Sequence, residues 1–127
     1  MYKQIKLTGN WEMKDSFEVL AEFLAECATV AYYPEYTTIT SSPAAGVMLS
    51  QMCDHSVESA SNGGDGWFYK TREAWRRDTG INRSGQETAR RILVEKGIID
   101  ERRKGIPAKM HFRVNFDRLF CLLSALD

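Results

Sequence analysis

The sequence lacks the features that place a protein in a membrane or on a secretory route. Its 127 residues contain no apolar run near the roughly 18 residues that a membrane-spanning helix needs. The first six residues lack the apolar stretch of a signal peptide. We therefore expect a cytoplasmic protein that does not enter a membrane. We also expect one domain, residues 1–127, because two separate cores would be cramped.

Cysteine and histidine are scarce. The three cysteines, Cys27, Cys53 and Cys121, are odd in number and widely spaced, which argues against disulfides or a Cys-x-x-Cys site. The only histidines are His55 and His111, and a metal site needs more ligands than Cys53 and His55 supply. We expect buried free thiols, no metal and no cofactor.

Catalytic motifs are missing as well. The chain has no Gly-x-Ser-x-Gly elbow, no His-Glu-x-x-His pair and no Walker loop. Because catalysis needs a spaced set of nucleophile, acid and base, we expect no enzymatic activity. Hydrophobic residues make up 43% and aromatic residues 11% of the chain, which is enough for a packed core and excludes global disorder.

What the chain does have is an uneven distribution of charge. It contains 17 basic and 17 acidic residues, and this net charge of zero argues by itself against a nucleic-acid binder. However, residues 1–66 hold three basic and nine acidic side chains, a net charge of −6, and residues 67–127 carry the balancing +6. The asymmetry indicates an interaction surface in the second half, and it predicts a dipolar molecule with one basic and one acidic face.

Apolar periodicity predicts a helix over residues 15–33, ended by Pro34. This helix is apolar on more than one side, so it either lies sandwiched in the core, which we favour, or presents a dimer or partner surface. Residues 36–40 are β-branched and predict a short strand. Ser42 and Pro43 then open a helix to about residue 55, followed by a flexible loop over residues 56–66.

The second half carries most of the information. Residues 67–70 predict an aromatic strand, and Thr71 caps a helix over residues 72–79. A tight turn at 80–82 leads to a second helix, opened by a Ser84-x-x-Glu87 capping box and running to about residue 96. Strands at 98–103 and 109–115, joined by a turn, precede a closing helix over residues 116–126.

Two helices joined by a short glycine turn form a helix-turn-helix, and a hairpin directly after them makes it winged. We therefore expect an α+β, mainly helical fold, a winged helix-turn-helix with an extra N-terminal helix and a C-terminal helix. Residues 1–36 would be a helical extension and residues 37–127 the winged-helix core. The same arrangement also occurs as a scaffold or a protein-binding module.

The polar side chains of this unit suit DNA. Arginine and glutamine make bidentate contacts with guanine and adenine edges in the major groove, and a helix N-terminus binds phosphate. The Arg83–Glu87 and Glu87–Arg91 spacings also fit ordinary surface ion pairs, but arginine is in excess. The expected contacts on the recognition helix are Arg83, Ser84, Gln86, Glu87, Arg90 and Arg91. Those on the wing are Arg102, Arg103, Lys104 and Lys109, and those to the DNA backbone are Lys70, Arg72 and Arg76.

Residues 66–119 resemble the winged helix-turn-helix domains of phage and mobile-element replication-initiation proteins. The matching segments are 66–71, Glu73, Trp75, 80–81, Gln86, 88–90, 93–99, 104–109 and 111–115, with 43–45 and 51–52 similar to that family's preceding helix. The resemblance implies sequence-specific binding to double-stranded DNA, often at repeats in a replication origin or an operator. It places the recognition helix at residues 84–96 and the wing at 102–109.

Partners follow from the same observations. We expect double-stranded DNA, with a replication protein as a further partner implied by the resemblance. A further alternative is a homodimer formed through the helix at 15–33. The alternative function is a protein-interaction module on a winged-helix scaffold, such as a phage-type inhibitor or a transcriptional regulator.

Overall fold

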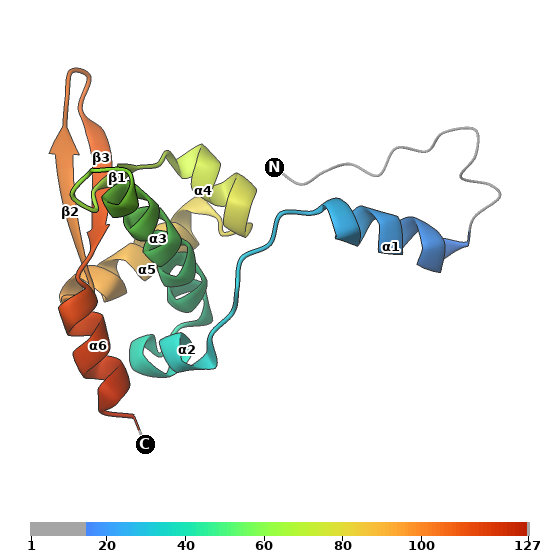
Figure 1. The fold of residues 1–127 in the computed structure, drawn as a ribbon, viewed down its shortest axis with the longest axis horizontal. Coiled ribbons are helices and arrows are strands. Elements are labelled where there is room, and N and C mark those ends of the chain that lie inside the picture. Colours follow the sequence, from blue (N-terminus) through green and yellow to red (C-terminus); the bar gives the residue numbers. More distant parts are fainter. Residues whose placement is uncertain (1–14, 127) are drawn as a thin grey trace.

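A computed structural model describes residues 15–126, within which six helices accompany a three-stranded antiparallel sheet (Figure 1). The elements are α1 (Ser16–Glu26), α2 (Pro34–Thr40), α3 (Pro43–Ser61), β1 (Phe68–Tyr69), α4 (Arg72–Thr79), α5 (Arg83–Glu95), β2 (Ile99–Lys104), β3 (Lys109–Val114) and α6 (Phe116–Ser124). The predicted α+β, mainly helical class is confirmed. No helix within residues 15–126 is long and apolar enough to cross a bilayer.

The sheet has the order β1-β3-β2, so the C-terminal strand lies in the middle. Phe68 pairs with Phe112, and Ile99 pairs with Val114. Helix α3 contacts β1 and β3, and α5 contacts β2, while the β2–β3 hairpin projects beyond the helices (Figure 1). The buried apolar core consists of Ile39, Ala45, Met48, Leu49, Met52, Trp75, Ala89, Leu93, Ile98, Ile99, Phe112, Val114 and Leu119.

The N-terminal helix is shorter than predicted and lies apart from the core. It ends at Glu26, and residues 27–33 have no regular secondary structure (Figure 1). None of the residues of α1 is buried, so the interpretation that this helix is sandwiched in the core is wrong. The β-branched Thr29 and Val30 favour extended backbone, and Pro34 disfavours helical backbone at Tyr33.

Pro34 begins a helix rather than ending one. It occupies the first turn of α2, where its missing N–H leaves no helical hydrogen bond unmade. The strand predicted for residues 36–40 is therefore wrong. The Thr38 and Thr40 hydroxyls donate to carbonyls one turn earlier, at 3.1 Å and 2.6 Å, and Ile39 is buried. Packing against α3 overrides the β-propensity of these residues.

Helix α3 extends to Ser61, six residues beyond its predicted end, so the flexible loop predicted from residue 56 is wrong over its first half. Ser56 is completely buried, and its Oγ accepts a hydrogen bond from the Val114 N–H at 3.1 Å. This contact fixes the end of β3 to α3. The loop that remains is short, residues 62–67.

The three cysteines are free, but they are not all buried as expected. Cys121 is exposed, and Cys27 and Cys53 are half-buried. Burial raises the pKa of the Cys53 thiol to about 11, and its sulfur lies 3.8 Å from the Tyr36 hydroxyl. Burial and this thiol also raise the pKa of Tyr36. These residues join α2 to α3.

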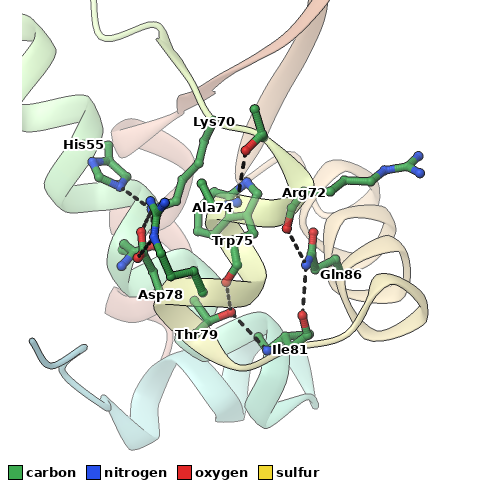
Figure 2. A network of polar contacts seen from close by, with 12 residues as sticks. His55, Lys70, Arg72, Ala74, Trp75, Asp78, Thr79, Ile81 and Gln86 are labelled. Atoms are coloured by element: carbon green, nitrogen blue, oxygen red, sulfur yellow. Dashed lines mark hydrogen bonds and ion pairs between the residues drawn. The ribbon is translucent and has the colours of Figure 1, made fainter. Parts of the chain in front are cut away.

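A buried lysine joins β1, α3 and α4 (Figure 2). The Lys70 ammonium donates to Asp78 Oδ2 at 2.5 Å and to Gln51 Oε1 at 2.6 Å. It lies 3.1 Å from His55 Nε2 and 4.7 Å from the centre of the Trp75 ring. Because an ammonium group has no acceptor, His55 Nε2 must be unprotonated to receive its third hydrogen bond.

This geometry predicts a stability that depends on the ionisation of His55. Burial and the adjacent Lys70 charge lower the pKa of His55 below 6.5, against the opposing effect of nearby carboxylates. As the pH falls, the unfolded chain takes up this proton before the folded protein does. The free energy of unfolding should therefore decrease from about pH 7.5 to about pH 5.5.

Urea denaturation at several pH values measures this effect. The control is His55→Gln, whose amide oxygen is also able to accept from Lys70 but does not titrate, and it should show a weaker pH dependence. The Lys70 hydrogen bond lowers the pKa of Asp78, so that carboxylate stays ionised across the range. If His55→Gln showed an unchanged pH dependence, the assignment of this dependence to His55 would be contradicted.

Candidate nucleic-acid interface

The turn between α4 and α5 is built from local capping contacts. Thr71 Oγ1 accepts from the Ala74 N–H at 3.0 Å, as predicted for the start of α4. Gly80 ends α4 with φ of +74°, a conformation that glycine adopts without strain. The N-cap of α5 lies two residues earlier than predicted, because Asn82 Oδ1 accepts from the Gly85 N–H at 2.8 Å. Asn82 is thus the N-cap, and the Ser84 capping box is wrong.

Gln86 was expected at the DNA surface, and the structure corrects this. The side chain points into the angle between α4 and α5 (Figure 2), and the residue is 2% exposed. Its Nε2 donates to the Arg72 carbonyl at 3.1 Å and to the Ile81 carbonyl at 2.9 Å. Gln86 therefore holds the two helices together through backbone groups, and its amide N–H groups are not free to read a base.

The prediction that Arg90 contacts DNA is also wrong. Its guanidinium makes two hydrogen bonds with the Glu101 carboxylate, at 3.0 Å and 2.7 Å, and its side chain is 17% exposed. The Glu101 bond raises the pKa of Arg90, and the guanidinium lies 5.4 Å from the centre of the Phe112 ring. Sequence reasoning missed Glu101, although an acidic side chain near the base of a basic hairpin was the available signal. The pair fixes α5 to β2.

Lys70 was expected to contact the DNA backbone, but its hydrogen bonds to α3 and α4 leave the residue only 9% exposed. Its ammonium is therefore unavailable to a phosphate.

The remaining predicted contact residues of α5 form an exposed row along one side of the helix. Arg83, Glu87 and Arg91 follow one another at four-residue intervals, with Ser84 in the first turn, and all four are exposed. Glu87 lies between two cations, 3.2 Å from Arg83 and 3.6 Å from Arg72 on α4. Both pairs are well exposed, so each contributes little to stability. The structure thus brings the start of α4 beside the row on α5.

A basic groove lies between α4, α5 and the hairpin. It has a volume of about 300 Å³, and Arg72, Arg90 and Arg103 line it from these three elements. Arg90 is neutralised by Glu101, whereas Arg103 has no ion-pair partner within residues 15–126. Arg76, one turn after Arg72, is also exposed and unpaired in that part of the chain.

The four predicted wing cations do not share one side of the hairpin. Strand alternation places Arg103 on the same side as Glu101, which faces α5. Arg102, Lys104 and Lys109 project from the opposite side, where the Arg102 guanidinium lies 4.1 Å from the Trp67 ring centre. Lys109 and Tyr69 also reach the edge of the basic groove. Only Arg103 therefore lies directly across the groove from the row on α5.

Within residues 15–126, no group of three or more histidine, cysteine, aspartate or glutamate side chains is placed to hold a metal ion. No protein-family model matches the chain, and no curated protein or solved structure was found to match it.

The burial of Gln86 predicts a structural rather than a DNA-contact phenotype. Gln86→Glu replaces the donor NH₂ with a carboxylate that faces two carbonyl oxygens. The free energy of unfolding should fall by about 2–3 kcal/mol, measured by urea denaturation. The exposed Glu95→Gln is the control and should change it by less than about 0.5 kcal/mol. A Gln86→Glu variant with normal stability would contradict the structural role assigned to Gln86.

A double-mutant cycle tests whether Arg90 and Glu101 join the hairpin to α5. The variants Arg90→Ala, Glu101→Ala and their combination should give a coupling energy of about 1–2 kcal/mol. The exposed Arg83–Glu87 pair has the same charges and should couple by less than about 0.5 kcal/mol. Equal coupling in the two pairs would show that Arg90 is not held by Glu101.

Proposed function

We propose that this protein binds double-stranded DNA as a winged helix-turn-helix, with α5 as the recognition helix and the β2–β3 hairpin as the wing. The observation that carries this proposal is the basic groove, where Arg72 of α4 and Arg103 of the hairpin lie beside the exposed row on α5. A duplex presents both kinds of group that such a surface binds, because its phosphates position a protein and its base edges are read for sequence.

Sequence would be read by the exposed row on α5. Arg83 and Arg91 present guanidinium groups, which pair with the O6 and N7 atoms of guanine. Glu87 accepts from the amino group of cytosine, and its contacts with Arg83 and Arg72 hold it at the surface. Ser84 in the first turn of α5 suits a phosphate, because the helix N-terminus presents free N–H groups there.

The groove itself suits the DNA backbone. A phosphate strand that passes between α5 and the hairpin would meet Arg72 on one side and Arg103 on the other. At the tip of the hairpin, Ile106 is fully exposed between Lys104 and Lys109. An apolar tip with cations on either side fits a minor groove, where apolar side chains contact sugars and base steps.

The resemblance to replication-initiation proteins makes origin or operator repeats the proposed target, with a replication protein as a further partner. Selection of bound fragments from random DNA identifies the target. Direct repeats would support an origin, and palindromic half-sites would support a symmetric dimer on an operator.

A second candidate function has a separate observation in its favour. Helix α1 exposes Phe17, Leu20 and Leu24, and α6 exposes Phe116 and Phe120. Exposed apolar side chains in this number are typical of protein-interaction surfaces. They favour a homodimer through the N-terminal helix or a module that binds another protein. Sedimentation detects the dimer. Recovery of one stoichiometric partner after nuclease treatment, with no DNA shift, would favour the module over the DNA binder.

The proposal predicts a specific effect for Arg91→Ala. Affinity for the selected duplex should fall by about 1–3 kcal/mol and discrimination at one base position should weaken, because a base contact is lost. Arg77→Ala is the control, since it removes the same charge from the other side of α4, where Arg77 contacts Asp78. It should change affinity by less than about 0.5 kcal/mol. Fluorescence anisotropy with labelled duplex measures both variants.

A salt series accompanies this measurement. If about five phosphates are contacted, log affinity should fall against log salt concentration with a slope near −4.5. An affinity that does not respond to salt, or equal losses in Arg91→Ala and Arg77→Ala, would contradict the proposed interface.

A further inference from the structure

The sheet has a second face, opposite to the one that packs against α3 and α5. Phe68, Phe112 and Val114 point from the sheet into the core, where α3 and α5 lie. Alternation along the strands places the neighbouring side chains on the opposite face. This outer sheet face is formed by Trp67, Tyr69, Asp100, Arg102, Lys104, Lys109, His111 and Arg113.

Aromatic rings and cations alternate across the outer sheet face. The Arg102 and Arg113 guanidinium carbons lie 4.1 Å and 4.7 Å from the centre of the Trp67 ring. The Lys109 Nζ lies 5.0 Å from the Tyr69 ring centre, and the Tyr69 and His111 rings are 5.7 Å apart. Each aromatic ring is therefore in contact with cationic groups that are themselves partly open to solvent.

This face carries a strong excess of positive charge. Its one acidic residue is Asp100, which lies 3.4 Å from Arg113. Arg102, Lys104 and Lys109 have no ion-pair partner within residues 15–126. Tyr69 is 44% exposed, so one face of its ring is accessible to a ligand beside Lys109. The face thus combines free cations with the exposed ring of Tyr69 and the half-buried rings of Trp67 and His111.

We propose that the outer sheet face is a binding site for single-stranded nucleic acid. Unpaired bases stack on aromatic rings and guanidinium planes, and the phosphates between them need cations at short intervals. Tyr69 and the Trp67–arginine cluster supply the planes, and Arg102, Lys104 and Lys109 supply the charge. A duplex makes poor use of these rings, because its bases are already stacked on one another.

The site goes beyond the proposed function and does not require it. The row on α5 and the outer sheet face lie on opposite sides of β2 and β3. Tyr69 and Lys109 also reach the edge of the basic groove, so a variant on the α5 row is needed to separate duplex binding from single-strand binding. The two activities are therefore measurable with separate probes, and the failure of one does not decide the other.

The test uses the full chain and a fluorescein-labelled oligothymidine of about 15 nucleotides, a length that covers a small binding site. Anisotropy should show saturable, salt-dependent binding. Tyr69→Leu removes the exposed ring and keeps apolar bulk, and it should weaken binding about 5- to 100-fold. Tyr69→Phe keeps the ring and should bind within about twofold of the unaltered protein. Trp67→Leu should act in the same direction as Tyr69→Leu.

The matched control is Arg91→Ala, which should leave oligothymidine binding unchanged. Circular dichroism and thermal melts establish that each variant is folded. The proposal is overturned if the protein does not bind oligothymidine, or if folded Tyr69→Leu binds as well as Tyr69→Phe. It is also overturned if Arg91→Ala weakens binding as much as Tyr69→Leu. Competition by polyglutamate as effective as that by unlabelled oligothymidine would show an acidic-polymer surface instead.

Discussion

The hydrogen bonds of the Lys70 ammonium are the constraint on which the arrangement of α3, β1 and α4 depends. Removing an ammonium group from water costs several kcal/mol unless its donors are satisfied. Here its three donors meet three acceptors, on Gln51, His55 and Asp78, and its charge faces the Trp75 ring. Because these acceptors come from α3 and α4, Lys70 is satisfied only when both helices are in place. The position of α4, and through the turn that of α5, follows from this.

Two further polar groups extend this constraint from α4 to the hairpin. Gln86 joins the first residues of α4 to the turn before α5, and Arg90 joins α5 to β2. Both side chains are of types that are able to contact DNA, but here they hydrogen-bond to other parts of the protein. The chain therefore divides its polar residues into a set that fixes the geometry and a set that stays free. In the proposed interface, the free arginines need the fixed ones, because a guanidinium that is to read a base edge requires a rigid helix beneath it.

Sequence reasoning was most successful where local physics decides the structure. The limits of α4, its Thr71 cap, the left-handed Gly80 and the hairpin all follow from capping and turn chemistry. It failed where tertiary packing decides the structure. The β-branched residues of α2 are helical because α3 buries Ile39, and α3 continues because Ser56 binds the end of β3. In the candidate site, periodicity gave the exposed row on α5. It gave no information on the partners that bury Gln86, Arg90 and Lys70, since those partners lie 5 to 19 residues away.

The structure shows how the basic residues of the second half of the chain are distributed. A dipolar molecule remains a prediction for the whole chain, but the basic half is itself divided by the sheet. On the helix-facing side, Arg103 and the arginines of α4 and α5 accompany polar neighbours that suit groove edges and phosphates. On the outer face, the cations accompany the exposed Tyr69 ring and the half-buried Trp67 ring. Rings contribute little to duplex recognition and much to the binding of unpaired bases. A strand only two residues long, β1, thus adds Tyr69 and the adjacent Trp67 to the hairpin and gives its outer face a different chemistry from its inner face.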